Sequence, residues 1–216
     1  MQDTTAFILG RREQREADFM VTLYTEDFGL IRATAQGVRK SAAKLRGHLE
    51  PFSRSSVSLV EGRAGYRLTG STLCDYYPEI RCSLARGAAA EGAAALVART
   101  FFQEKDPILW RALEEFFSGL NHNELSPSQS SQALFWFSVR VLVLLGYRPS
   151  LDALFSETPR LRATLLVYEN ENLENVLKNG LPTAALLAVA RALLRVFQVH
   201  TGELFNFFSA PILLEG

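Results

Sequence analysis

The chain has 216 residues, and its 23 Lys and Arg are matched by 23 Asp and Glu, so its formal net charge is zero. Hydrophobic residues make up 48% of it and charged residues 21%. These values are typical of a globular protein of one large or two small domains, and they exclude a disordered chain and a histone-like polycation. A neutral protein can still bind nucleic acid, because a local basic patch is enough.

The sequence predicts neither a metal site nor a membrane segment. Cys74 and Cys82 are too few for a four-cysteine zinc site, and their spacing does not fit a CxxC redox motif. The apolar run at 6–9 is too short for a signal peptide, and the longest apolar stretch, 133–147, is interrupted by Arg140. We therefore expect a soluble, cytoplasmic protein with free thiols, no cofactor and no membrane contact.

Up to about residue 80, apolar and polar residues tend to alternate, which is typical of strands with one buried face. Turn-like sequences, Glu26-Asp27-Phe28-Gly29 and 61–65, separate two pairs of these runs. Five strands are predicted, at 5–12, 19–25, 30–37, 52–61 and 65–73. Five short antiparallel strands in so few residues favour a small barrel of the oligonucleotide-binding (OB) fold.

After residue 80 the spacing of apolar residues changes to the three and four of a helix, beginning in the Ala-rich stretch 88–98 and continuing to Phe117. Ser126 and Pro127 predict the start of a core helix at 129–145, and Gly146 predicts its end. A last helix is expected at 183–199, whereas 165–168 is read as a short strand or an extended segment. The predicted fold class is α+β: an OB-fold domain at 1–80 and an all-α domain at 81–216.

Basic residues gather in and after the third predicted strand, where the stretch from Ile31 to Leu49 has five cations and no Asp or Glu. A second cluster follows the first strand. Phosphate binding requires such clustering, because each neutralised phosphate releases a counterion. The candidate DNA-binding residues are Arg12, Arg15, Arg32, Arg39, Lys40, Lys44 and Arg46. The alternative is a solvated loop without a partner.

Base stacking and catalysis have weaker signals. Tyr24 is the best candidate for an exposed stacking ring, because it alternates with Val21 and Leu23. The three histidines lie far apart, and no nucleophile elbow, phosphate loop or dinucleotide motif occurs. No enzyme activity is therefore predicted.

The core helix predicted at 129–145 is apolar nearly all round, with Arg140 in its midst. One interpretation is a core helix whose arginine reaches water or a carboxylate. The other is a groove in which an apolar peptide docks and Arg140 binds its carboxylate. The candidate partner-binding residues are Phe135, Trp136, Val139, Arg140 and Val143.

The order of short motifs in the first domain resembles that of the bacterial RecO family of recombination mediators. The matching segments are Arg15-Glu16-Ala17-Asp18, Val21-Thr22-Leu23-Tyr24-Thr25, Gly29, Arg32-Ala33, Gly37-Val38-Arg39, Leu45-Arg46-Gly47, Leu49-Glu50-Pro51-Phe52, Gly62-Arg63, Leu68-Thr69, Tyr77-Pro78 and Ile80-Arg81. In the second half the match is thinner, at Phe137, Arg140, Leu142, Leu144-Leu145-Gly146-Tyr147, Pro149 and Leu151-Asp152.

The resemblance implies an OB fold followed by a helical domain, and a protein that binds single- and double-stranded DNA and anneals complementary strands. It implies work with RecR to load RecA on gapped DNA, and binding of the C-terminal tail of the single-stranded-DNA-binding protein. Two features depart from the family. Leu154 and Glu157 stand where many relatives begin a four-cysteine zinc module, so no zinc is expected. Phe135 and Trp136 stand where some relatives carry tail-holding arginines.

The function predicted from the sequence is that of a non-catalytic DNA repair and recombination mediator, in the cytoplasm and associated with the nucleoid. The alternative is a protein-interaction adaptor whose OB barrel does not bind nucleic acid. An RNA-binding OB protein is a third interpretation.

Overall fold

A computed structural model describes residues 1–14, 18–36, 48–63, 65–122, 125–148, 152–153 and 159–201. The chain divides into two compact units. The first unit holds Met1–Tyr77 together with Ala94–Trp110, and the second holds Pro78–Ala93 and the described residues from Arg111 onward. The division into domains at residue 80 stays a prediction.

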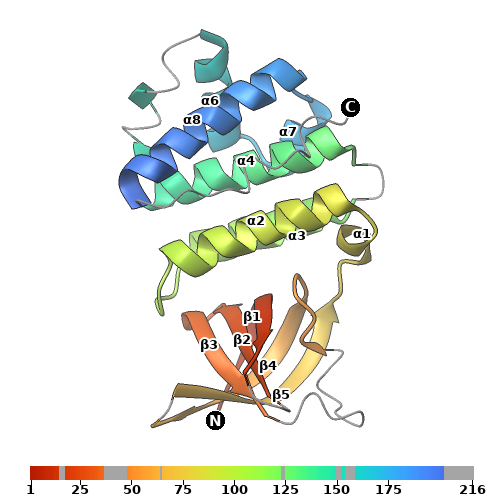
Figure 1. Ribbon diagram of the computed structural model, residues 1–216, viewed down its shortest axis with the longest axis vertical. Helices are drawn as coiled ribbons and strands as arrows, with labels where there is room; N and C mark the ends of the chain where they lie inside the picture. Colours follow the sequence, from red (N-terminus) through yellow and green to blue (C-terminus); the bar gives the residue numbers. More distant parts are fainter. Residues whose placement is uncertain are drawn as a thin grey trace. The chain divides into compact units, whose positions relative to one another are not determined.

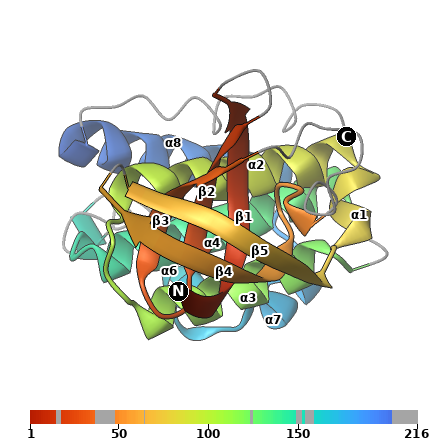
Figure 2. The ribbon, with the colours of Figure 1, turned by 90° about the horizontal axis from the view of Figure 1, so that it is seen from below.

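Five strands form the first unit: β1 (Gln2–Glu13), β2 (Phe19–Thr25), β3 (Gly29–Ala35), β4 (Arg54–Gly62) and β5 (Gly65–Asp75). They close into a barrel in the order β1-β2-β3-β5-β4, as the ribbon shows from two directions (Figures 1 and 2). Among the described strands, β3 and β5 pair in parallel, and the other neighbours are antiparallel. The predicted OB-fold barrel followed by helices is confirmed.

The barrel core comes from the inward positions of every strand. Ile8, Val21, Leu23, Val57 and Leu59 are almost fully buried there, as expected from the period-two alternation. Burying a side chain of this size stabilises the fold by about 1.5–3 kcal/mol, so the core is the main source of barrel stability.

Part of the outer face of the barrel is also buried, because Ala94–Trp110 packs against it. This covering segment consists of the end of α2 (Leu84–Thr100), a connection, and the start of α3 (Pro107–Leu120). The Trp110 ring lies 4.8 Å from the Phe7 ring on β1. The backbone N–H of Leu30 donates to the Phe102 carbonyl at 3.0 Å. The helical periodicity up to Phe117 belongs to two helices, α2 and α3.

The covering segment overturns the expectation that Tyr24 is exposed. Its side chain does point away from the barrel core, but it is 0% exposed. Its hydroxyl donates to the Asp106 carbonyl at 3.4 Å, and its ring lies 6.4 Å from that of Phe101. Burial raises the pKa of the phenol. The alternation along β2 correctly predicts that Tyr24 points away from the barrel core. It does not predict which segment packs on the outer face.

In the part of the second unit that the structure describes, the elements are helices: α1 (Pro78–Arg81), most of α2 and α3, α4 (Pro127–Leu144), α6 (Pro159–Asn170), α7 (Leu173–Lys178) and α8 (Thr183–Thr201). Within this unit α4 contacts α6, α7 and α8 (Figure 1). Residues 165–168 lie in α6, so the predicted strand is wrong. Leu165 and Tyr168 are buried one helical turn apart, and a four-residue apolar run alone does not distinguish strand from helix.

Both ends of α4 follow the sequence prediction. The Ser126 side chain accepts from the Gln129 N–H at 3.2 Å, and the Gln129 side chain accepts from the Ser126 N–H at 2.9 Å, which is a capping box. At the other end, Gly146 has φ +83°. The N–H groups of Gly146 and Tyr147 donate to the Val143 and Leu142 carbonyls, which is a Schellman motif.

Arg140 and Trp136 on α4 bind the end of α6. The Arg140 guanidinium donates to the Tyr168 carbonyl at 3.0 Å and to the Glu171 carbonyl at 2.8 Å, and it lies over the Trp136 ring at 4.9 Å. The Trp136 indole N–H donates to the same Glu171 carbonyl at 3.1 Å. Carbonyls at a helix C-terminus lack partners within the helix, and these two side chains satisfy them.

One helix of the described residues, α8, is long and apolar enough for its Thr183–His200 window to cross a membrane by length and composition. Within the helical unit its Leu186, Val189, Leu193, Val196 and Phe197 are buried. A core helix of a water-soluble fold has the same composition, so the property does not distinguish the two.

Replacement of Gly29 by Ala is expected to destabilise the first unit strongly. Gly29 has φ +68°, and a Cβ there would overlap the backbone of Glu104 in the covering segment. Gly146 also has a positive φ, but a Cβ there meets nothing within 4 Å, so G146A is the matched control for backbone strain. We expect G146A to cost about 1 kcal/mol and G29A about 2 kcal/mol more, measured by urea unfolding. Equal losses would contradict this account of the contact.

Replacement of Arg140 by Ala is expected to lower the free energy of unfolding by about 2 kcal/mol, because two charge-assisted hydrogen bonds to α6 carbonyls are lost. Arg162 is an exposed arginine on α6, so R162A is the control and should change stability by less than about 0.5 kcal/mol. Thermal unfolding followed by circular dichroism compares the two. If R140A lowers the stability no more than R162A does, the contacts of Arg140 with the α6 carbonyls do not stabilise the fold.

Candidate nucleic-acid interface

Two of the predicted DNA-binding arginines, Arg12 and Arg32, are exposed on the outside of the barrel. Arg12 lies near the end of β1 and pairs in register with Met20 on β2. Arg32 lies on β3 between the core residues Ile31 and Ala33, and pairs with Thr22. Its guanidinium donates to the Ala98 carbonyl at 3.3 Å, so Arg32 lies at the border of the covering segment.

The other five, Arg15, Arg39, Lys40, Lys44 and Arg46, lie outside the described residues. The residues at both ends of the basic segment 37–47 are described. Gln36 follows Ala35, which pairs with Leu68 on β5, and the His48 ring lies 2.7 Å from the Ser71 carbonyl on the same strand. The hydroxyl of Ser71 donates to the His48 carbonyl at 3.2 Å. The described residues that flank the basic segment therefore lie beside residues 68–71 of β5.

Several other cations of this unit are neutralised by carboxylates. Arg11 pairs with Glu50 at 3.0 Å and lies over the Phe19 ring. Arg54 pairs with Asp75 at 2.6 Å, and Lys105 lies 3.8 Å from Asp27. These three contribute to the barrel and its covering rather than offering an unpaired charge to a polyanion.

Arg67 on β5 is an exposed cation that the sequence prediction omitted. In the strand register it lies opposite Thr34 on β3. No carboxylate of the described residues lies within ion-pair distance of Arg67. The alternation of Arg67 with Tyr66 and Leu68 was the available signal for its outward position. The candidate residues were chosen from clusters of basic residues in the sequence, and a single arginine inside a strand is not part of such a cluster.

The predicted partner-binding residues divide by burial. Phe135, Trp136 and Val139 are at most 1% exposed and belong to the core of the helical unit. Arg140 and Val143 are half-buried. Of the two interpretations left open for Phe135 and Trp136, the burial favours the core, and a partner can touch these side chains only after a rearrangement. Contact with a partner stays a prediction.

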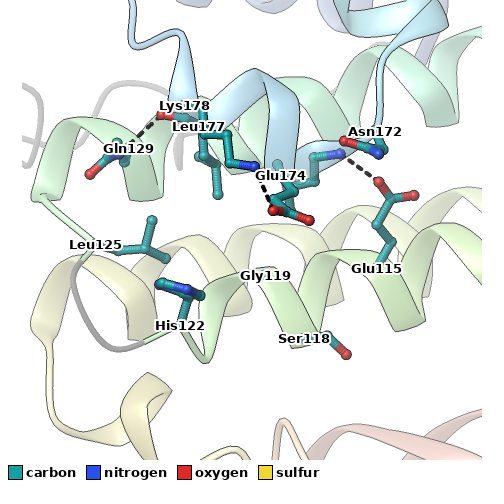
Figure 3. A pocket seen from close by; sticks show the side chains of 11 residues that line it. Glu115, Ser118, Gly119, His122, Leu125, Gln129, Asn172, Glu174, Leu177 and Lys178 are labelled. Carbon is teal, nitrogen blue, oxygen red and sulfur yellow. Dashed lines mark hydrogen bonds and ion pairs between the residues drawn. The ribbon is translucent and has the colours of Figure 1, made fainter.

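A cavity of about 650 Å³ lies in the helical unit between α3, the start of α4 and α7 (Figure 3). Leu125, Leu173 and Leu177 line it, with Glu115 and Glu174 among its polar groups. A carboxylate oxygen of Glu115 accepts from the Leu173 N–H, and Lys178 pairs with Glu174 at 2.7 Å and lowers the pKa of that carboxyl. Two carboxylates at its wall are unfavourable for an acidic ligand.

The described residues hold no group of three or more His, Cys, Asp or Glu that could bind a metal ion. Glu169 and Arg148 form the most buried ion pair of α6, at 2.9 Å. Burial raises the pKa of Glu169, and Arg148 opposes that shift. This ion pair links α6 to Arg148, which follows the end of α4.

Comparison with known proteins identifies the family of the barrel unit and several relatives of the chain. Residues 1–77 match the family described as "Recombination protein O N terminal". The chain is 38% identical over 149 residues to the DNA repair protein RecO of Geobacter sulfurreducens, covering 68% of this chain and 60% of the relative. It is 34% identical over 170 residues to that of Dehalococcoides mccartyi, covering 78% and 66%. It is 33% identical over 153 residues to that of Myxococcus xanthus, covering 70% and 61%.

The chain thus spans 60–66% of the length of these relatives. The matched family covers the strands that carry Arg12, Arg32 and Arg67 and the ends of the basic segment. The longer alignments extend beyond the barrel unit into the helices. From its barrel topology, its N-terminal family and these relatives, the chain belongs to the RecO family of DNA repair proteins.

Proposed function

We propose that this protein is a non-catalytic mediator of recombinational DNA repair, which binds single- and double-stranded DNA and anneals complementary strands. Cations at one end of the barrel neutralise phosphates of two strands, which lowers their repulsion while the bases stay available for pairing. No reacting group is needed for this activity. The relatives are named as DNA repair proteins, which supports a role in repair. We infer that the protein acts in the cytoplasm, on the chromosomal DNA.

One observation carries the proposal. The exposed Arg12, the outward face of β3 and both ends of the basic segment 37–47 meet at the same end of the barrel. Met20 pairs with Arg12 on one side and Thr34 on the other, which brings the end of β1 beside the end of β3. Arg12 and the residues that flank the basic segment therefore lie at one end of the barrel, which supports cooperative phosphate binding there.

Reversing the charge of Arg39, Lys40, Lys44 and Arg46 to Glu should abolish binding of a fluorescent single-stranded oligonucleotide, measured by anisotropy. The control reverses four exposed arginines of the helical unit, Arg111, Arg160, Arg162 and Arg191, so that the net charge changes equally. Thermal unfolding should stay nearly unchanged in both variants. Equal loss of affinity in both would show a general charge effect and contradict a local site.

Salt dependence separates this function from the adaptor alternative. A site that neutralises about six phosphates loses roughly 10³-fold in affinity between 50 and 200 mM salt, because released counterions are bound again on dissociation. Docking of an apolar peptide changes little over that range. Wild-type protein that binds DNA no better at 50 than at 200 mM salt would favour the adaptor.

We further propose that the helical unit binds the acidic, apolar C-terminal tail of the single-stranded-DNA-binding protein, and that RecR joins the complex so that RecA is loaded on gapped DNA. The family supports these partners. Arg140 and Val143 are the two predicted contact residues on α4 that are accessible in the fold as it stands. Phe135, Trp136 and Val139 then hold this part of α4 from within.

Replacement of Val143 by Glu should weaken binding of the tail peptide about tenfold, because it places a negative charge beside an acidic ligand. Leu166 is an exposed apolar residue on α6, so L166E is the control. Fluorescence titration with labelled peptide measures both, and thermal unfolding followed by circular dichroism reports whether the helices of V143E are folded. Unchanged peptide affinity in a folded V143E protein would remove this part of α4 from the tail site.

A further inference from the structure

We propose that a single nucleic-acid strand crosses the barrel perpendicular to its β-strands, along a row of outward side chains that ends at Arg67. The row consists of Arg12 on β1, Met20 on β2, Thr34 on β3 and Arg67 on β5, and is called the Arg12–Arg67 row below. It rests on the proposed function, and it identifies the ligand as the sugar–phosphate backbone rather than the bases.

Strand register carries the row. Arg12 pairs with Met20, Met20 pairs with Thr34, and Thr34 pairs with Arg67, so each residue lies directly beside the next across four neighbouring strands. Paired residues project from the same face of a sheet. The sequence neighbours on β2, β3 and β5, such as Val21, Ala33 and Leu68, are in the barrel core, so the row faces outward.

The spacing of the row suits a polyanion. Neighbouring strands lie about 4.8 Å apart, so Arg12 and Arg67 are separated by about 14 Å at the backbone. One strand of B-form DNA carries a charge every 3.4 Å or so along its axis, which places several phosphates within the length of the row. A guanidinium at each end can then bind two separate phosphates in a bidentate manner.

Charge in the described part of the barrel leaves both ends available. No carboxylate of the described residues forms an ion pair with Arg12 or Arg67, whereas Arg11, Arg54 and Lys105 are each paired. The nearest carboxylates in the register, Glu13 and Glu61, pair with Phe19 and Tyr66 and so occupy positions of the opposite parity. The threonine hydroxyl and the half-buried Met20 add no charge between the two arginines.

The row offers no ring on which a base could stack. Two aromatic residues on the outer face of β1 and β2, Phe7 and Tyr24, are fully buried beneath the covering segment. Stacking on aromatic side chains is the usual source of base contacts in OB folds that bind single strands. Without it, binding along the row depends on phosphates and is indifferent to base identity.

Replacement of Arg67 by Gln tests the row on the full-length protein. Removing one phosphate contact with a single strand lowers the salt slope by about 0.7, which is about a fivefold loss of affinity at 0.1 M salt. The probes are a labelled thymidine oligonucleotide and a mixed-sequence oligonucleotide of equal length, and the loss should be the same for both. In the double variant R12Q/R67Q the salt slope should fall by about twice as much as in R67Q. Arg162→Gln is the control, and thermal unfolding should be unchanged because Arg67 is exposed.

The outcomes separate the row from the proposed function. If wild-type protein binds DNA with a steep salt dependence and R67Q behaves like R162Q, the row is wrong and the function stands. A loss confined to one of the two oligonucleotides would also overturn it, because that would indicate readout of bases. If wild-type protein does not bind either probe at any salt concentration, the proposed function itself fails.

Discussion

Close packing of the covering segment, Ala94–Trp110, against the outer face of the barrel decides which barrel residues meet solvent. The contact requires a glycine at position 29, where the chain has a positive φ and any Cβ would overlap the Glu104 backbone. Trp110 packs on Phe7, and the Leu30 N–H finds a partner in the Phe102 carbonyl. One face of the barrel is thereby converted into a second buried surface, which a closed barrel does not need for its own core.

The covering segment determines which kinds of side chain remain exposed on the barrel. The rings of Phe7 and Tyr24 are removed from solvent, and the arginines at the opposite end of the strands remain. A surface of cations without rings binds through long-range, salt-sensitive attraction and carries little information about sequence. Such a surface is consistent with the proposed annealing activity, in which strands of any sequence are held while their bases stay free to pair.

In the helical unit, the buried Trp136 and the half-buried Arg140 together hold two helices in contact. Trp136 and Arg140 converge on the Glu171 carbonyl and hold the end of α6 against α4. An arginine in an apolar helix suggested a carboxylate-binding groove, but backbone carbonyls satisfy it equally well. Because Phe135, Trp136 and Val139 are buried, the proposed role of α4 in partner binding depends on Arg140 and Val143.

The relatives of this chain are longer than it is, and the zinc-module positions 154 and 157 lie outside the described residues.

The amino-acid sequence by itself determined the five strands, the OB-type barrel, the boundaries of α4 and the existence of a basic segment. These follow from short-range patterns: alternation along a strand, a capping box at Ser126, and a left-handed glycine at 146. Only the tertiary structure decided that Tyr24 is buried, that 165–168 is helical, and that Arg67 lies in line with Arg12. The helix at 165–168 was missed because a four-residue apolar run is compatible with a strand or a helix. The burial of Tyr24 and the position of Arg67 depend on segments distant in the chain, and local periodicity carries no information about which segment packs against which face.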